Sequence, residues 1–543
     1  MKQTHTAIIC LALLVTMVSC QKESDTVTLG VRIDDIAGNQ KLYINGNTPQ
    51  WEDGDPIWIN SNGDYTVTIN NNTAQIANVA RDENNQYTAV FPAGIVTSQN
   101  SDRTVNINLP REQEYHSSNN VQSIMIPMIA YNDGNDLHFK NLCSLVKVNI
   151  TNTTGNSISI NRITLTASTA RLSGPTTASI TVDNQNNKYG QLGTWDNEAE
   201  HDVSLVFPSP ENISGTSRDF YIAVPEFGNT ELSIIIYTND NRFLPVLKNS
   251  VNLAHNSIAT VSVAISDQNP LLTTQEVFTV DGNNTKVRFS KGNLQYTTDS
   301  THSTADGTAT GTWRFAKHQY DFIGSANSNI STSYDGWIDL FGWGTSGYNN
   351  KVPTLSSNSY SDYYYSMNIS TRYYDWGLYN NIDNYTYGTW RTPTRSEWEH
   401  ILATRAGVSI GETYTDARYA VSKVNGVKGL MLFPDGFQWP TNSINPPSVC
   451  NGYESNWNNR NYSIAQWAIL ESAGIIFLPA AGYRTGSTIY DSGESGWYWT
   501  STKVSNRTGM AYDIIVEGDH VSENSGQIDI FNGLSVRLVR NSN

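Results

Sequence analysis

The chain has 543 residues and a formal net charge of −16, and its length predicts roughly two to four domains. The excess of acidic side chains argues against nucleic acid or an anionic membrane surface as a partner, because both are bound through Lys and Arg. Cys10 and Cys20 lie in the N-terminal segment, which leaves Cys143 and Cys450 for the rest of the chain. We expect both to be buried free thiols, so stability must come from hydrophobic cores rather than from a disulfide framework.

The first 26 residues predict export and attachment of a lipid. The apolar run at 7–18 follows Met1 and Lys2 and is too short to span a bilayer, as in a secretory signal peptide. It ends in Val-Ser-Cys, which resembles the lipobox of bacterial lipoproteins. That resemblance implies a signal peptide at 1–19, lipidation of Cys20, a tether at 20–26 and anchoring in the outer membrane at the cell surface. The alternative is an ordinary signal peptide with an incidental cysteine.

Residues 27–265 predict an almost pure β structure. Short runs alternate apolar and polar residues between turn residues, as in DPIWIN (55–60), SLVKVNI (144–150) and ELSIIIYT (231–238). Side chains of a strand alternate between two faces, so each run buries one face and exposes the other. Many short strands with little helical periodicity predict two β-sandwiches in tandem.

The same region carries patches that resemble, in order, fimbrillin-like pilins, the lipoprotein subunits of type V pili. The resemblance implies tandem β-sandwiches, a place in a fimbrium, and other pilin subunits as partners through donor-strand addition. In that family an arginine-directed protease removes the first strand, and a neighbouring subunit supplies a replacement. Arg32 and Arg81 are both open as cleavage sites, and a spacer of the same fold is the alternative. The patches include WEDGDPIWI (51–59), YTAVFPAG (87–94), LHFKNLCSLVKVNITN (137–152) and FYIAVP (220–225).

The composition changes after a polar linker at 266–276. Eleven of the fourteen tryptophans lie beyond residue 300. Two helices are predicted there by capping boxes, one at Thr394 with Glu397 and one at Ser463 with Gln466. With the apolar β runs around them, these helices predict an α+β domain at 277–543.

Several motifs of this domain resemble the C-type-lectin-like fold in the branch shared with formylglycine-generating enzymes. The oxidases of that branch use a cysteine pair, whereas only Cys450 lies in this half, so we predict no enzyme. The Glu-Pro-Asn or Gln-Pro-Asp tripeptide of calcium-dependent lectins is missing too, so we expect no cofactor, and calcium binding stays an open alternative that no motif supports. The motifs are WRTPTRSEWEHIL (390–402), FLPAAGYRTG (477–486), GWYWTST (496–502) and GLSVRLVR (533–540).

Aromatic side chains in the loops of this half are the candidates for binding. Tyr and Trp offer wide apolar faces and one polar group, which suits sugar rings and protein surfaces alike. Packing into the core is the alternative for each of them. The candidate residues are Tyr363, Tyr364, Tyr365, Tyr373, Tyr374, Trp457, Asn458, Tyr483, Arg484, Tyr490 and Trp497.

A pilin-like part followed by a recognition-like part suggests a tip or minor fimbrial subunit that acts in adhesion. The ligand would be a glycan or a surface protein. The second hypothesis is a surface glycan-binding lipoprotein of a polysaccharide uptake system, in which the pilin-like half is a spacer.

Overall fold

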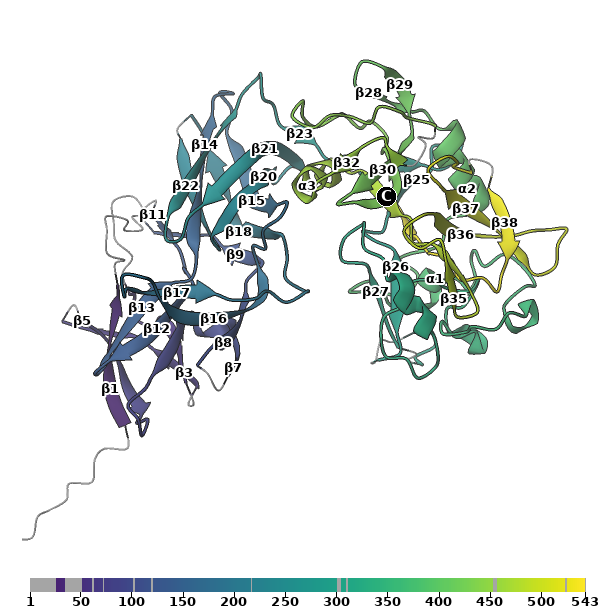
Figure 1. Ribbon diagram of the computed structural model, residues 1–543. Helices are drawn as coiled ribbons and strands as arrows, with labels where there is room; N and C mark the ends of the chain where they lie inside the picture. The colour runs from purple at the N-terminus through teal and green to yellow at the C-terminus, as the bar shows by residue number, and fades with distance from the viewer. Residues whose placement is uncertain are drawn as a thin grey trace, which may run out of the picture. The chain divides into compact units, whose positions relative to one another are not determined.

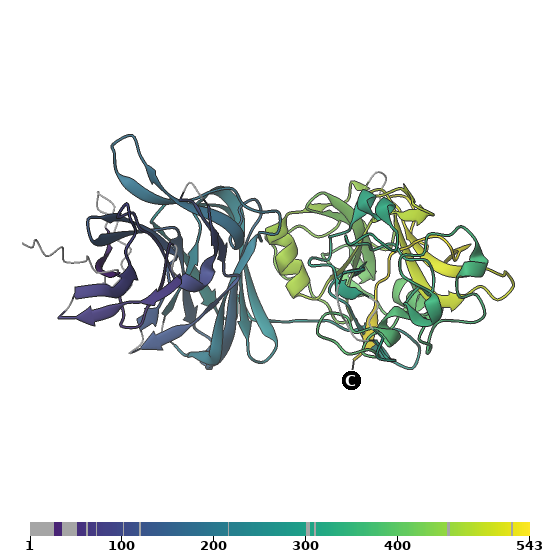
Figure 2. The same ribbon diagram turned by 90° about the horizontal axis from the view of Figure 1, so that it is seen from below.

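The computed structural model describes residues 26–34, 51–60, 63–71, 73–100, 103–118, 121–215, 217–299, 304–308, 311–452, 457–522 and 525–542 (Figures 1 and 2). Strands account for most of its regular structure, which confirms the predicted mainly-β class. The chain forms two compact units. The first contains the described residues up to Ile107 together with Met125–Leu142 and Thr177–Gly193, and the second contains Asn108–Ile124, Cys143–Thr176 and Thr194–Asn543.

The first unit is built on an eight-stranded sheet. Alternate residues of its strands, among them Leu29, Val31, Ile57 and Ile59, are buried in one core, as the period of two predicts. A four-stranded sheet completes the unit, in the order β17 (Lys188–Leu192), β16 (Gly174–Val182), β8 (Val105–Leu109), β7 (Val96–Gln99). The order of the larger sheet is β3 (Gly63–Thr66), β2 (Pro56–Ile59), β6 (Thr88–Phe91), β12 (Met128–Asp133), β13 (Asp136–Asn141), β1 (Thr26–Ile33), β5 (Thr73–Ala80), β4 (Thr68–Asn70).

The second unit begins with a β-sandwich. Residues from its two sheets share one core, in which Val146, Val148 and Ile150 alternate with less buried neighbours. One sheet has the order β19 (Arg218–Val224), β14 (Ser144–Asn152), β22 (Ile258–Ile265). The order of the other is β23 (Leu272–Thr273), β21 (Arg242–Leu253), β20 (Phe227–Thr238), β15 (Ile158–Ala167), β18 (Asp202–Ile213), β9 (Glu112–Glu114), and a hairpin joins β10 (His116–Ser118) to β11 (Val121–Ser123).

The C-terminal part of the second unit has short strands in small sheets and a few helices. The four-stranded sheet has the order β32 (Asn461–Tyr462), β30 (Tyr419–Val424), β31 (Val427–Leu432), β33 (Ile476–Pro479). Two three-stranded sheets have the orders β24 (Phe278–Thr279), β25 (Lys286–Phe289), β39 (Val539–Asn541) and β36 (Gly496–Lys503), β37 (Met510–Val516), β38 (Gly526–Asp529). Three two-stranded sheets pair β26 (Leu294–Thr297) with β27 (Thr312–Phe315), β28 (Val408–Ile410) with β29 (Tyr414–Ala417), and β34 (Tyr483–Thr485) with β35 (Thr488–Tyr490). The α-helices are α1 (Trp376–Tyr379), α2 (Arg395–Glu399) and α3 (Ile464–Ser472).

Both predicted capping boxes are confirmed. The Thr394 side chain accepts from the backbone N–H of Glu397, whose carboxylate accepts from the N–H of Thr394, and Ser463 and Gln466 make the same pair of bonds. After α2 the chain continues as a π-helix over His400–Thr404. Cys143 and Cys450 are both free and buried, as expected.

Helix α3 joins the two parts of the second unit. It packs against β20, β15 and β21, and both views show this green helix beside the teal strands of the sandwich (Figures 1 and 2). Ile235 and Phe243 of the sandwich share a core with Trp467 and Leu470 of the helix. The predicted linker also contributes a strand, since β23 pairs with β21. The sandwich and the C-terminal part therefore share a continuous packed interface.

Candidate functional site

The tyrosine loops of the C-terminal part form a cluster of rings in mutual contact. The rings of Tyr364 and Tyr374 stack with their centroids 3.7 Å apart. Tyr348 meets Tyr373 and Tyr374 edge to face at 5.5 and 5.2 Å, and it also contacts Tyr379. Each ring is held by its neighbours, so the cluster is preorganised, while Tyr373 keeps 46% of its surface exposed.

A second exposed group lies in the same stretch of sequence. Tyr360 and Tyr365 meet edge to face with centroids 5.6 Å apart, and their exposed fractions are 44% and 40%. Gly509 lies directly under Tyr360, where a Cβ would stand 2.6 Å from the ring. Met367 adds a further exposed apolar side chain. These loops therefore present large apolar groups to solvent, as expected of a recognition surface.

The structure places three of the predicted binding residues inside the protein. Tyr363 is buried and donates its hydroxyl to the Ser357 carbonyl at 2.8 Å. Trp457 is buried in a core that it shares with Trp398. The prediction of a surface role for these side chains is corrected, because a buried ring has no face for a ligand.

Arg484 is the third of these residues. Its guanidinium is fully buried and donates to the carbonyl oxygens of Leu340, Gly486 and Leu355 at 2.8, 3.0 and 2.9 Å. Burial lowers the pKa of this side chain. Three of its five N–H groups bond to carbonyl oxygens of loops and the side chain is fully buried, so Arg484 ties these loops together and presents no surface to a ligand.

The remaining predicted residues are at or near the surface. Tyr483 stacks on Tyr490 at 5.2 Å and lies 4.9 Å from Trp497, with Tyr490 exposed. Asn458 is exposed, next to the buried Trp457. Tyr364, Tyr374, Tyr483 and Trp497 all pack against one core. The role of the accessible residues in binding stays a prediction.

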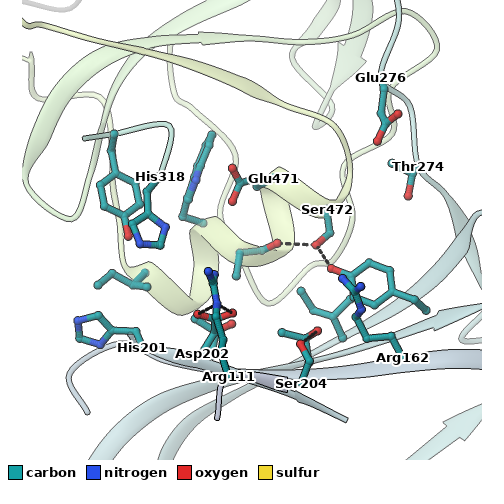
Figure 3. Close-up of a pocket in the computed structure, with 18 of the residues that line it drawn as sticks. Arg111, Arg162, His201, Asp202, Ser204, Thr274, Glu276, His318, Glu471 and Ser472 are labelled. Carbon is teal, nitrogen blue, oxygen red and sulfur yellow. Dashed lines mark hydrogen bonds and ion pairs between the residues drawn. The ribbon is translucent and has the colours of Figure 1, made fainter. Parts of the chain in front are cut away.

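A pocket of about 380 Å³ lies at the contact between α3 and the sandwich, which we call the junction pocket (Figure 3). Arg111 donates from Nε to both carboxylate oxygens of Asp202 at 3.0 Å on the sandwich side. Ser472 on the helix side shares a 2.6 Å hydrogen bond with the Tyr237 hydroxyl. Figure 3 shows Glu471 entering from the helix, opposite the Arg111–Asp202 pair.

The electrostatics of this junction are set by burial and by pairing. Burial raises the pKa of Glu471, which lines the pocket. Burial alone would lower the pKa of His318, but its 2.9 Å contact with Glu200 raises it overall. The sequence alone did not reveal this pocket, because its residues are scattered from Arg111 to Ser472 and form no local motif. The capping box predicts the helix α3, but it does not predict which sheet face this helix covers.

Strand β1 occupies an interior position of the eight-stranded sheet. It pairs in parallel with β13 and antiparallel with β5. Arg32, one of the two candidate cleavage residues, forms a 2.6 Å ion pair with Asp136 at this strand. Gly30 allows the close approach, since a Cβ there would stand 2.1 Å from a carboxylate oxygen of Asp136.

Two other expectations concern metals and the membrane. Within the described ranges, no three His, Cys, Asp or Glu side chains are grouped to hold a metal ion. The helices of these ranges are all too short or too polar to cross a membrane. Cys20 lies outside the described residues, so its lipidation stays a prediction.

Comparisons with known proteins give only weak likenesses. No family model and no curated protein matches the sequence. A candidate cell adhesion protein of Bacteroides ovatus is 11% identical, with a TM-score of 0.29 over 46% of this chain and 94% of that one. A tip fimbrial protein of Porphyromonas gingivalis is 10% identical, with a TM-score of 0.18 over 40% of this chain and 90% of that one. The minor pilin of Streptococcus agalactiae is also 10% identical, with a TM-score of 0.17 over 44% of this chain and 95% of that one. Scores this low carry no argument about function.

Proposed function

We propose that the protein is a cell-surface fimbrial subunit that acts in adhesion, at the tip or as a minor subunit. The setting of strand β1 carries this proposal. Both of its edges are paired, and Leu29 and Val31 fill the core beneath it. Release of such a strand leaves a groove with two hydrogen-bonding edges and alternate pockets, which a strand of another subunit fits.

The energetics favour refilling of that groove. Burial of the Leu29 and Val31 side chains away from water contributes about 2 kcal/mol of favourable free energy each. The open edges of β13 and β5 add backbone groups that need partners. An empty groove therefore exposes apolar surface and leaves backbone groups without hydrogen bonds. A donated strand with the same alternation of apolar residues covers that surface and pairs with those backbone groups.

The C-terminal end of the sandwich in the second unit supports a terminal position. A stalk subunit needs a strand to hand to its neighbour, whereas β22 remains paired with β14 and leads through β23 into the C-terminal part. The preorganised tyrosine loops of that part are the proposed adhesive surface, with a glycan or a surface protein as ligand. Anchoring through Cys20 in the outer membrane belongs to the same proposal.

The test locks β1 in place with a disulfide. Val27 and Val79 are direct partners across β1 and β5, so cysteines at both positions can be oxidised to hold the strand. Cells carrying Val27→Cys with Val79→Cys are compared with cells carrying Val27→Cys alone, and pili are sheared off and quantified. We expect substoichiometric incorporation of the single variant, and loss of incorporation of the oxidised double variant that a reductant restores.

Two results would contradict the proposal. Equal incorporation of the oxidised double variant would mean that β1 does not leave during assembly. Absence of the unmodified protein from sheared pili, with an even spread over the cell surface, would favour the glycan-binding lipoprotein of a polysaccharide uptake system instead.

A further inference from the structure

We propose that the tyrosine loops (residues 348–374) bind an acidic segment of a protein, in which carboxylates flank aromatic or apolar side chains. This inference rests on the proposed adhesive role of these loops and narrows the ligand to one class. It is drawn from basic side chains that stand beside exposed tyrosine rings, on a chain whose formal net charge is −16.

A second segment, residues 501–510, lies against the tyrosine loops. The backbone N–H of Lys503 donates to the side-chain oxygen of Asn368 at 3.0 Å. Further along, Gly509 lies directly under the ring of Tyr360. The two segments therefore form one continuous surface of the C-terminal part, which we call the tyrosine face.

The charge of the tyrosine face is opposite to that of the whole chain. Its two segments contain one acidic side chain, Asp362, and four basic ones, Lys351, Arg372, Lys503 and Arg507. Asp529 of the adjacent β38 lies opposite Met510 and adds one exposed carboxylate at the margin. A positive excess remains after both carboxylates are counted, so the face attracts acidic rather than basic partners.

Two arginines of this face are available to a ligand. Arg372 and Arg507 are both exposed. Their printed contacts are with thioether sulfurs, because Nη2 of Arg372 lies 3.1 Å from Sδ of Met367 and Nη1 of Arg507 lies 3.9 Å from Sδ of Met510. Neither guanidinium forms an ion pair with a carboxylate among the described residues. Since a thioether is a weak acceptor, both groups can still bind a carboxylate through paired N–H groups.

The residue types of the face favour a protein as the source of that carboxylate. Tyr365, Met367 and Tyr373 are exposed around Arg372. Tyr, Met and Arg are enriched at protein–protein interfaces, and Tyr and Arg supply much of the binding free energy there. An acidic segment with apolar side chains uses both the rings and the arginines, whereas a sulfated glycan is bound chiefly through the charges.

The experiment measures the kinetics of binding to the whole exported chain by surface plasmon resonance. The main probe is a synthetic peptide that repeats Glu-Glu-Tyr. A peptide that repeats Lys-Lys-Tyr reverses the charge, and one that repeats Glu-Glu-Ser removes the rings. A heparin oligosaccharide and a neutral maltooligosaccharide are the glycan probes. We expect the Glu-Glu-Tyr peptide to bind more tightly than each of the other four probes.

The charge variant combines Arg372→Gln with Arg507→Gln. We expect the association rate of the Glu-Glu-Tyr peptide to fall about tenfold and its dependence on salt to weaken, because charges at the margin of an interface act mainly on the encounter. The matched control combines Arg103→Gln with Lys248→Gln, which removes two exposed charges outside the tyrosine face and should change neither quantity.

The ring variant combines Tyr365→Ala with Tyr373→Ala. We expect the peptide to dissociate about tenfold faster, because lost contacts of this kind act mainly on the dissociation rate. Tyr387→Ala, which removes an exposed ring outside the tyrosine face, is the control and should leave dissociation unchanged.

Several results would overturn this inference. They are no binding of the Glu-Glu-Tyr peptide, equal binding of the Lys-Lys-Tyr peptide, tighter binding of either glycan probe, or unchanged kinetics in both the charge variant and the ring variant. The proposed fimbrial role is judged separately, because incorporation into pili is measured with the cysteine variants of β1. A subunit that enters pili and fails these binding tests would refute the ligand class alone.

Discussion

Asp513 is a buried carboxylate whose two oxygens find no hydrogen-bond partner among the described residues. It lies on β37 opposite Gly526 of β38, where a Cβ would stand 2.6 Å from its Oδ1. Burial raises its pKa from 3.8 to about 7. The folded state therefore holds the proton more tightly than the unfolded chain does, so stability from this group is complete below about pH 4 and falls as the pH rises to about 7.

We predict that Asp513→Asn stabilises the protein at neutral pH by up to about 4 kcal/mol and flattens this part of the pH profile. The measurement is the free energy of unfolding from denaturant titrations at a series of pH values. Asp529→Asn, in the neighbouring strand β38, is the control. A pH profile of Asp513→Asn that is parallel to that of the unmodified protein would show that the carboxylate does not titrate in this range.

At the scale of elements, the caps of α2 and α3 allow a matched comparison. Both helices have a complete capping box, but Ser463 of α3 also donates to Glu231 of the sandwich. We predict that Thr394→Ala costs about 1 kcal/mol, and that Ser463→Ala costs more because it also removes a link between the two parts. Equal losses in the free energy of unfolding would show that the contact with Glu231 adds nothing.

Much of the element pattern is predictable from the sequence, and the reasons are local. Alternation of apolar and polar residues predicts strands such as β14, because one face of the sheet is buried and the other is not. The capping box of Ser463 and Gln466 predicts where α3 begins. Which loop tyrosines are accessible is not predictable in this way. Tyr363 and Tyr365 differ by two positions in a run of three tyrosines, yet one is buried and the other exposed, because long-range packing decides burial in a loop.

At the scale of the whole molecule, the contact between the sandwich and the C-terminal part includes a charged cluster beside its apolar core. Glu200 accepts from His318 at 2.9 Å and forms an ion pair with Lys317, whose ammonium also reaches the Glu198 carbonyl at 3.2 Å. Burial would raise the pKa of Glu200, but these cations lower it to about 2. The ionised Glu200 carboxylate therefore stabilises the folded state above about pH 4.5, and this stabilisation is lost as the pH falls towards 2.

The alkaline limit of the same contact is set by His318. Its pKa is raised, since the pairing with Glu200 and the nearby carboxylates of Asp321 and Glu471 outweigh burial. A raised pKa means that the stabilisation is complete below about pH 6.5 and is lost as the pH rises through the folded value. We predict that the melting temperature of the second unit falls by about 2 °C more in the unmodified protein than in His318→Gln as the pH is raised from about 6 to 9. Differential scanning calorimetry measures this, with His520→Gln in a surface turn as the control. Identical slopes for the unmodified protein and His318→Gln would mean that the histidine stays neutral at the junction, and that Lys317 alone holds Glu200 across it.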